Sequence, residues 1–183
     1  TLLVSPYGMR KHMNDLIDKE IKAAKKGQPA SIILKLNSLS DIKLVDKLCH
    51  ASTVGVKVDL IIRGIYCAKK ILKKKEKNPY AISIVDEYLE HSRVLAFHNS
   101  GDPLVYISSA DCMVRNLDHR IEAASPILDK QLRNELIEIL HIQLKDNIKA
   151  RLLDPDFHNN YVPSRRDKAV RAQYEIYRFL SRN

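Results

Sequence analysis

The chain has 183 residues, of which 45% are hydrophobic, and this length and composition fit one α/β domain with a substantial core. No apolar run approaches the roughly 18 to 20 residues that a membrane-spanning helix needs, and the N-terminal residues lack the layout of a signal peptide, so we expect a soluble chain. The formal net charge of +9 favours polyanionic ligands, although a basic, solvated surface would give the same total.

The first half of the chain predicts alternating helices and strands. Apolar residues recur at helical spacing up to a Gly-Gln-Pro breaker, and two later apolar runs of strand type flank a second helical segment. The predicted elements are a helix from Met9 to Ala24, a strand over 31–36, a helix that Ser40 or Asp41 caps and Gly55 closes, and a strand over 56–62. A strand, a helix and a strand joined by short links form a parallel βαβ unit.

The second half predicts a β-hairpin, a further strand and two helices. A lysine-rich run is typical of a solvated loop, and an Asn-Ser-Gly-Asp turn between two apolar runs predicts the hairpin. In chain order the segments are the loop Lys69–Lys77, an apolar stretch over 82–89, strands over 93–98, 104–108 and 121–127, a helix over 130–144 that Asp129 begins, a polar surface segment over 154–166 and a helix over 169–180.

The three cysteines are odd in number and lack CxxC or Cys/His spacing, which argues against a disulfide framework and a zinc site. This cysteine usage fits a reducing cytoplasm. The chain begins with Thr1 and runs directly into an apolar strand, so we expect a piece of a longer protein with something missing upstream.

Two polar segments are predicted to meet beside the hairpin. His91 and Arg93 lie just before its first strand. The segment at the end of its second strand holds Ser108, Ser109 and Asp111. An imidazole can take or give a proton near its unperturbed pKa of about 6.5, and a guanidinium can bind two phosphate oxygens at once. These segments are therefore suited to phosphoryl chemistry, with a structural, hydrogen-bonded role for His91 as the plainer alternative.

Arg63 directly follows a strand that is predicted to be buried, and open α/β sheets bind ligands beyond the carboxyl ends of their strands. It is therefore a candidate ligand contact, with an ion pair to a carboxylate such as Asp59 or Asp86 as the structural alternative. The polar loop over 115–120 is charge-dense, although such loops are often only solvated. The five glycines form no GxxxxGK[ST] motif, which excludes a nucleotide site of the P-loop type.

Six blocks of the sequence carry a family pattern in the same order. They are Leu2-Leu3-Val4-Ser5-Pro6 with Met9-Arg10, Ile32-Ile33-Leu34-Lys35-Leu36-Asn37, Val58-Asp59-Leu60-Ile61-Ile62-Arg63-Gly64, Tyr88-Leu89-Glu90-His91-Ser92-Arg93, Val105-Tyr106-Ile107-Ser108-Ser109-Ala110-Asp111 and Arg115-Asn116-Leu117-Asp118-His119-Arg120-Ile121-Glu122. Read together, the blocks resemble the C-terminal catalytic domain of the polyphosphate kinase family, which is of the phospholipase-D-like type. No single block is decisive, but their ordered combination is specific.

The resemblance implies a phospholipase-D-like mixed β-sheet flanked by α-helices, in a single domain over 1–183. It implies an enzyme that reversibly transfers the terminal phosphate of ATP to inorganic polyphosphate through a phosphohistidine. The family's two C-terminal domains resemble phospholipase D halves, whose HxK and GSxN or GSxD elements face each other across one site. His91-Ser92-Arg93 and Ser108-Ser109-Ala110-Asp111 resemble the second half's version, with Arg in place of Lys.

By this resemblance, His91 is the acid/base partner and an ATP-phosphate contact. Arg63 is a further ATP-phosphate contact, and Arg93 and Arg120 are candidates for the same phosphate-rich tunnel. The supporting motif positions are Ser108, Ser109, Asp111 and Asn116.

The phosphorylated histidine and the magnesium-binding arginines of the family belong to the preceding domain, and no segment here matches them. We therefore expect no metal ligand in this chain, with Mg²⁺ held elsewhere in the full enzyme, and an inactive isolated domain. The expected partners are ATP, ADP, inorganic polyphosphate, the preceding domains and further copies of the full-length protein, with no specific nucleic acid. The expected location is the cytoplasm, with membrane association also compatible.

The lysine run replaces a Pro/Gly-containing loop that is usual in the family, and we predict that it helps to hold polyphosphate. Two other functions stay open. One is a phospholipase-D-like phosphodiesterase or nuclease built from two copies of this half, against which Arg93 argues. The other is a non-catalytic polyanion-binding module, for which an aromatic content of 6% is low if the ligand is single-stranded nucleic acid.

Overall fold

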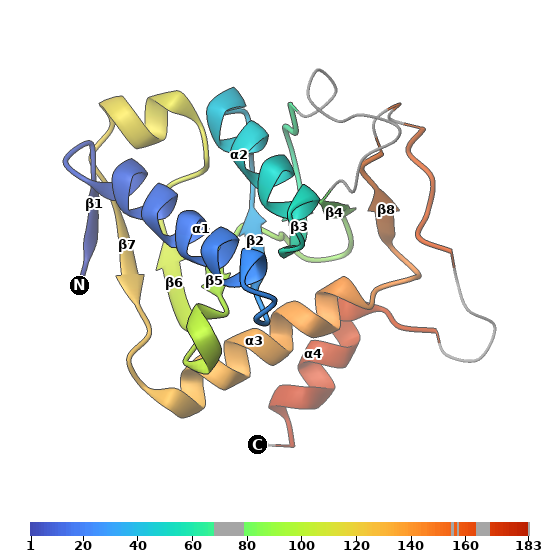
Figure 1. The fold of residues 1–183 in the computed structure, drawn as a ribbon. Coiled ribbons are helices and arrows are strands. Elements are labelled where there is room, and N and C mark those ends of the chain that lie inside the picture. The colour runs from blue at the N-terminus through green and yellow to red at the C-terminus, as the bar shows by residue number, and fades with distance from the viewer. Residues whose placement is uncertain (68–78, 155, 157, 164–168, 183) are drawn as a thin grey trace.

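The computed structural model describes residues 1–67, 79–154, 156, 158–163 and 169–182, which form one mixed sheet packed by helices (Figure 1). The strands are β1 (Leu3–Ser5), β2 (Ser31–Leu36), β3 (Lys57–Ile62), β4 (Tyr80–Ile84), β5 (Val94–Phe97), β6 (Leu104–Ser108), β7 (Glu122–Pro126) and β8 (Ala150–Leu152). The helices are α1 (Met9–Lys25), α2 (Ile42–Thr53), α3 (Lys130–Leu144) and α4 (Ala172–Leu180), with two short turns, η1 (Asn99–Gly101) and η2 (Arg115–His119). The lysine run Lys69–Lys77 lies outside the described residues.

The strand order across the sheet is β1-β7-β6-β5-β2-β3-β4-β8. β2 and β4 run parallel to β3, and the other neighbouring pairs run antiparallel. The predicted βαβ unit is confirmed, since β2, α2 and β3 follow one another with Ser31 opposite Lys57 and Leu36 opposite Ile62. The predicted hairpin of β5 and β6 is confirmed as well. The expected mixed α/β sheet is therefore the observed one.

Alternate residues of the central strands face two separate apolar cores. Ile32 and Leu34 of β2 belong to the core that α1 and α2 cover, whereas Ile33 belongs to the core that includes Leu140 of α3. This alternation follows from the two-residue period of a strand, and it explains why β2 and β3 are apolar on both faces. Burial of each large apolar side chain contributes roughly 1.5 to 3 kcal/mol, so both helix layers stabilise the sheet.

Two carboxylates begin helices where the sequence predicts caps. Asp41 accepts a hydrogen bond from the backbone N–H of Leu44 at 3.0 Å, and Asp129 accepts one from that of Leu132 at 2.9 Å. Each bond satisfies an N–H group that has no partner within the helix. Asp41 is confirmed as the cap of α2, and Asp129 as the cap of α3.

The buried carboxylate of Asp146 sets the start of the last two elements. Its Oδ1 accepts the backbone N–H groups of residues 148, 149 and 150 at 3.0, 2.7 and 3.0 Å, and its Oδ2 accepts that of Ala172 at 2.7 Å. The last helix therefore begins at Ala172, three residues later than its predicted start at Ala169. β8 was not predicted, because a strand of three residues is too short for an alternating pattern.

The apolar stretch over 82–89 divides between two structures. Its first residues belong to β4, and residues 85–93 connect β4 to β5 without a helix or a strand. This connection carries His91, so side-chain contacts rather than a backbone ladder must hold that residue.

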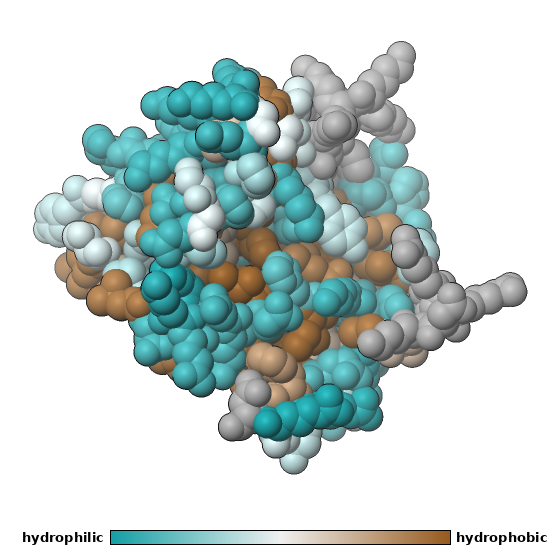
Figure 2. All heavy atoms as spheres, turned by 60° about the horizontal axis from the view of Figure 1, so that its bottom comes forward, coloured by the Kyte–Doolittle hydropathy of each residue, from teal (hydrophilic) through white to brown (hydrophobic). Residues whose placement is uncertain are grey.

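The described part of the chain has no helix long and apolar enough to cross a membrane. Figure 2 shows hydrophilic side chains over much of one face, with apolar residues visible between them. Exposed apolar side chains of α3, α4 and the residues before α3 include Leu128, Leu132, Tyr177 and Leu180. The surface of the described residues is therefore not a uniform polar layer.

Candidate active site

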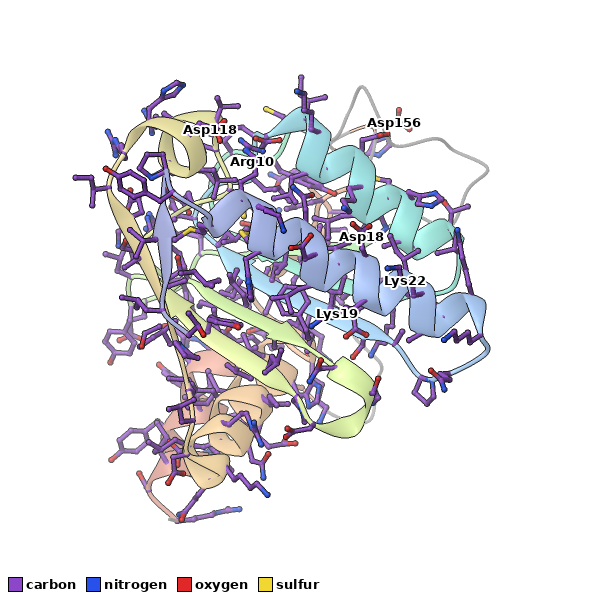
Figure 3. All side chains as sticks on the ribbon, turned by 60° about the vertical axis from the view of Figure 1, so that its left-hand side comes forward. Arg10, Asp18, Lys19, Lys22, Asp118 and Asp156 are labelled. Atoms are coloured by element: carbon purple, nitrogen blue, oxygen red, sulfur yellow. The ribbon has the colours of Figure 1, made fainter. Side chains whose placement is uncertain are left out.

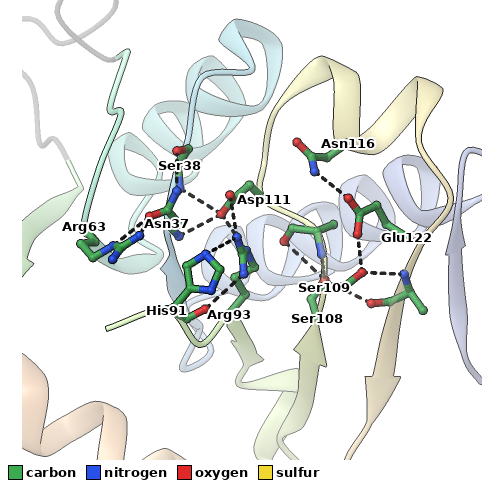
Figure 4. A network of polar contacts seen from close by, with 12 residues as sticks. Asn37, Ser38, Arg63, His91, Arg93, Ser108, Ser109, Asp111, Asn116 and Glu122 are labelled. Carbon is green, nitrogen blue, oxygen red and sulfur yellow. Dashed lines mark hydrogen bonds and ion pairs between the residues drawn. The ribbon is translucent and has the colours of Figure 1, made fainter. Parts of the chain in front are cut away.

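One edge of the sheet gathers most of the polar residues that the sequence singles out (Figure 4). Asn37 and Arg63 follow β2 and β3, and these parallel strands end at the same edge. β5 runs antiparallel to β2, so its beginning, next to His91 and Arg93, lies at that edge too. The backbone N–H of Ser108, at the end of β6, donates to the carbonyl of Arg93 at 2.9 Å. The predicted meeting of the two hairpin segments is therefore confirmed.

Arg93 and Asp111 form a bidentate ion pair at this edge. Nε and Nη2 of Arg93 donate to Oδ1 and Oδ2 of Asp111, each at 3.0 Å, and the two side chains are only 14% and 8% exposed. The backbone N–H groups of Asn37 and Ser38 also donate to Oδ1, each at 2.9 Å. Burial by itself would raise the pKa of Asp111, but the hydrogen bonds from Arg93 and these two backbone groups outweigh it and lower that pKa. Asp111 therefore stays ionised and ties the end of β2 to the hairpin.

The same guanidinium holds His91. Nη1 of Arg93 donates to the backbone carbonyl of His91 at 3.1 Å, and Nη2 lies 3.2 Å from the imidazole Nε2. Since a guanidinium can only donate, Nε2 accepts, and the proton of a neutral imidazole is assigned to Nδ1. Four of the five N–H groups of Arg93 are thus used within the site. Arg93 therefore links the exposed His91 to the buried carboxylate of Asp111 and fixes the orientation of the imidazole.

Arg63 is held in a different way. Its Nε and Nη2 donate to Oδ1 of Asn37 at 2.9 and 2.5 Å, which leaves Nη1 without a partner among the described residues. The predicted structural alternative, an ion pair of Arg63 with Asp59 or Asp86, is wrong, since other basic side chains bind those carboxylates. Arg63 is therefore fixed by a neutral amide and keeps N–H groups for a ligand.

The residue after Arg63 makes its close approach to β2 possible. The backbone N–H of Gly64 donates to the carbonyl oxygen of Asn37 at 2.8 Å, and a Cβ on Gly64 would lie 3.0 Å from the same oxygen. A larger residue would push the two backbones apart, because this oxygen belongs to the main chain and cannot rotate away. The Arg-Gly pair therefore allows Arg63 to reach Asn37.

The hydroxyls of Ser108 and Ser109 belong to a second set of hydrogen bonds. Ser109 Oγ donates to the carboxylate of Glu122, and Nδ2 of Asn116 donates to the other oxygen of that carboxylate at 2.7 Å. Ser108 Oγ accepts the backbone N–H of the residue two positions later at 3.0 Å. The sequence predicts hydroxyls opposite His91, but the structure uses them to fix the turn and to bind Glu122. Of the opposing segment, Asp111 makes the link to His91, through Arg93.

The turn η2 carries the last of the predicted residues. It is a π-helical turn, a rare conformation that is frequent at functional sites. Arg10 of α1 fixes it by donating to Asp118 at 2.5 and 2.7 Å and to Asp41 at 2.5 Å, and these bonds raise the pKa of Arg10 (Figure 3). Arg120 follows the turn with an exposed side chain that has no polar partner among the described residues. Its side chain is therefore outside both sets of hydrogen bonds that hold the other predicted residues.

Three residues at this edge had no predicted role: Asn37, Glu90 and Glu122. The available signal for Asn37 was its place directly after a buried parallel strand, the same signal that singled out Arg63. The contacts of Glu122 depend on the pairing of β6 with β7, and those of Glu90 on helices far along the chain, which no local pattern shows.

The described residues contain no group of three or more His, Cys, Asp or Glu side chains that could hold a metal ion. Mg²⁺ prefers carboxylate and phosphate oxygens. Here the oxygens of Asp111 and Glu122 already accept hydrogen bonds, so these residues do not fit a magnesium site. A cavity of about 850 Å³ lies beside Lys57 and Tyr80, at the opposite end of β3 from Arg63. The candidate site is therefore a cationic edge rather than that cavity.

Comparison with known proteins shows the family. The family model for polyphosphate kinase C-terminal domain 2 matches residues 2–173. The polyphosphate kinases of Klebsiella pneumoniae and Escherichia coli strain K12 are 48% and 46% identical over 179 residues, which is 98% of this chain and 26% of each relative. The chain thus spans about a quarter of the length of these relatives.

Solved structures agree with this match. The crystal structure of polyphosphate kinase from Porphyromonas gingivalis has a TM-score of 0.92 and 46% identity, over 98% of this chain and 28% of that one. NucT from Helicobacter pylori has a TM-score of 0.58 at 16% identity, over 79% of this chain and 94% of its own. Nuc from Salmonella typhimurium, a phospholipase D family member, has a TM-score of 0.56 at 13% identity, over 83% of this chain and 95% of its own. These two show the phospholipase-D-like fold alone. On the family match and the high-identity relatives, the chain belongs to the polyphosphate kinase family and corresponds to its C-terminal domain 2.

Proposed function

We propose that this chain supplies one side of the active site of an ATP:polyphosphate phosphotransferase that works reversibly. The observation that carries the proposal is the combination, at one edge, of an exposed and oriented His91 with Arg63, whose Nη1 has no partner among the described residues. Membership of the polyphosphate kinase family supports ATP and polyphosphate as the substrates.

The proposed chemistry needs positioning and neutralisation of charge. In the first step the bond between the terminal phosphorus of ATP and its bridging oxygen breaks and ADP leaves. At the same time the phosphorus bonds to a nitrogen of a second histidine, which is not His91. In the second step that P–N bond breaks as the phosphorus bonds to a terminal oxygen of polyphosphate. Negative charge spreads over the transferred group in both steps, so Arg63 can stabilise it with Nη1, and His91 can donate from Nδ1. Arg93 is proposed as a weaker phosphate contact, because only one of its N–H groups has no partner among the described residues.

The other side of the site is proposed to lie outside this chain. We place the phosphorylated histidine and the Mg²⁺ ligands in the part of the relatives' length that this chain does not span. Mg²⁺ would supply charge neutralisation of the phosphates there, and the residues described here would bind and orient ATP. Assembly into a homo-oligomer is supported by the family resemblance alone. A cytoplasmic location is supported by the three cysteines, which form no disulfide in the structure.

The test is ATP-dependent polyphosphate synthesis by the full-length protein that contains this chain. His91→Ala and Arg63→Ala are each expected to lower the rate by about 10² or more, the range for loss of an acid/base group or a charge-stabilising donor. Lys22→Ala is the matched control, because Lys22 is an exposed cation on α1, away from this edge (Figure 3).

Each outcome decides something different. A wild type without synthesis in either direction would overturn the proposed function, and hydrolysis of an aryl phosphodiester would then be measured. A wild type that makes polyphosphate, with both variants equal to it, would leave the activity standing and overturn the roles of His91 and Arg63.

A further inference from the structure

The segment that carries His91 has no regular structure of its own. Residues 85–93 form neither helix nor strand, and Tyr88, Leu89 and His91 are exposed. Without a backbone ladder, the position of His91 depends on contacts that other elements make with this segment. Arg93 provides such contacts on the C-terminal side of His91.

On the N-terminal side, the contacts come from the last helix and the residue before it. Arg171 donates to Asp86 at 2.8 and 2.7 Å, and the hydroxyl of Tyr174 donates to Glu87 at 2.9 Å. These side chains bind the beginning of the segment, four or more residues before His91. They fix where the segment starts, but not the residues next to the imidazole.

Gln173 binds closer to His91. Its Oε1 accepts the backbone N–H of Tyr88 at 2.9 Å, and its Nε2 donates to the backbone carbonyl of Tyr88 at 2.8 Å and to Oε1 of Glu90 at 2.9 Å. Ala172 and Gln173 are the buried residues of α4. A buried carboxamide is costly unless it is hydrogen bonded, and a helix that only packs against a core has an apolar residue at such a position. Here every bond of the buried amide goes to residues within three positions of His91.

The contacts of Glu90 extend this arrangement to the sheet. Its other carboxylate oxygen, Oε2, accepts from Nζ of the buried Lys35 and from Nε2 of Gln143, the latter at 2.9 Å. A cavity of about 380 Å³ lies between this segment and α3, lined by Glu90, Ser92 and Gln143 among others. Few atoms therefore support the segment by packing, and its hydrogen bonds must fix it.

We propose that Gln173 is a positioning residue for His91, so that the last helix of the chain is part of the active-site machinery. The inference rests on the proposed function for its effect on the reaction rate. An acid/base group must lie within hydrogen-bond reach of the atom it serves, and a shift of about 1 Å can cost roughly 10² in rate. Arg63 is held by Asn37 at the end of β2, outside the contacts of Gln173.

The test uses Gln173→Leu and Gln173→Glu in the full-length protein. Leu keeps the volume and removes three hydrogen bonds, whereas Glu keeps the acceptor for Tyr88 and faces Glu90 with a like charge. Both variants are expected to lower kcat by about tenfold or more, while KM for ATP stays within about twofold. Activity of Gln173→Glu relative to wild type is expected to rise as the pH falls, because a protonated acid can donate to Glu90.

Tyr177→Ala is the matched control, since Tyr177 lies on the same helix and is 73% exposed. Hydrogen exchange of residues 85–93 gives a readout without catalysis, and it is expected to be faster in Gln173→Leu than in wild type and control. Unchanged exchange would overturn the inference even if the wild type made no polyphosphate. A kcat loss that only follows the loss of folded protein, with no dependence on pH in Gln173→Glu, would reduce Gln173 to a structural residue and overturn it as well.

Discussion

Arg63 and Arg93 lie at the same edge of the sheet with the same charge, but the structure uses them differently. Arg93 pairs with the buried carboxylate of Asp111 and uses four of its five N–H groups inside the site. Among the described residues, the Arg63 side chain donates to one neutral amide oxygen, that of Asn37. A guanidinium beside a carboxylate is locally neutralised, whereas one beside an amide keeps its charge for a phosphate. The charge of the supporting residue therefore distinguishes a supporting arginine from one that can contact substrate.

The largest expected effect comes from breaking the supporting pair. Arg93→Ala leaves the carboxylate of Asp111 buried without its partner, which is expected to lower the free energy of unfolding by about 3 to 5 kcal/mol. Urea unfolding of the chain measures this loss. Replacing both residues, as in Arg93→Met with Asp111→Leu, is expected to cost less than the single change. A loss below about 1 kcal/mol in Arg93→Ala would show that the pair is not supporting the site.

The second prediction gives Arg63 a carboxylate neighbour, like the one that Arg93 has. Asn37→Asp places a carboxylate beside Arg63, so that Arg63 becomes locally neutralised in the way Arg93 is. The rate of polyphosphate synthesis by the full-length protein is expected to fall about tenfold, mainly through a higher KM for ATP. Asn37→Ala is the comparison, because it releases Arg63 without neutralising it. Equal rates in Asn37→Asp and wild type would contradict the role of the neutral amide.

A smaller effect is the dependence of the unfolding free energy on pH through Asp111. The pKa of Asp111 is lowered in the folded chain, so its ionised form stabilises the fold above the ordinary carboxyl pKa of about 3.8. That contribution is lost as the pH falls through the lowered, folded-state pKa. The difference in unfolding free energy between wild type and Asp111→Asn is therefore expected to be large at pH 7 and to shrink below about pH 3.8. A difference that stays constant between neutral and acid pH would contradict this expectation.

The smallest effect is expected at Arg120. Its side chain is exposed and has no polar partner in the described part of the chain, so Arg120→Ala is expected to change the free energy of unfolding by less than about 0.5 kcal/mol. The KM for polyphosphate in the full-length protein decides its predicted role in phosphate binding. An increase would establish a third kind of arginine at this edge, one with neither an amide nor a carboxylate beside it.

Local patterns predicted the parts of the site that depend on neighbouring segments. Apolar periodicity predicted β2, α2 and β3, and turn chemistry predicted the β5–β6 hairpin, and these two units bring His91 and Arg63 to one edge. The partners of the site residues could not be predicted in the same way. Gln173 and Tyr88 are 85 positions apart, and Asn37 and Asp111 are 74 apart. Only the packing of distant elements decides such contacts. For this reason the sequence predicted that the hydroxyls of Ser108 and Ser109 face His91, whereas in the structure they bind the backbone and Glu122.

Asp146 makes no hydrogen bond with His91, Arg63 or Arg93 in the described part of the chain, yet the geometry around His91 depends on it, because it holds the start of α4. This one carboxylate accepts four backbone N–H groups and so begins both β8 and α4. If the hydrogen bond from Ala172 to Asp146 breaks, α4 can detach from the sheet. The segment around His91 then loses its contacts with Gln173. Local opening of this kind requires less free energy than global unfolding. On warming, the chain is therefore expected to lose the geometry around His91 while the strands beneath Arg63 are still intact, so that heat inactivation would begin at the C-terminal helix.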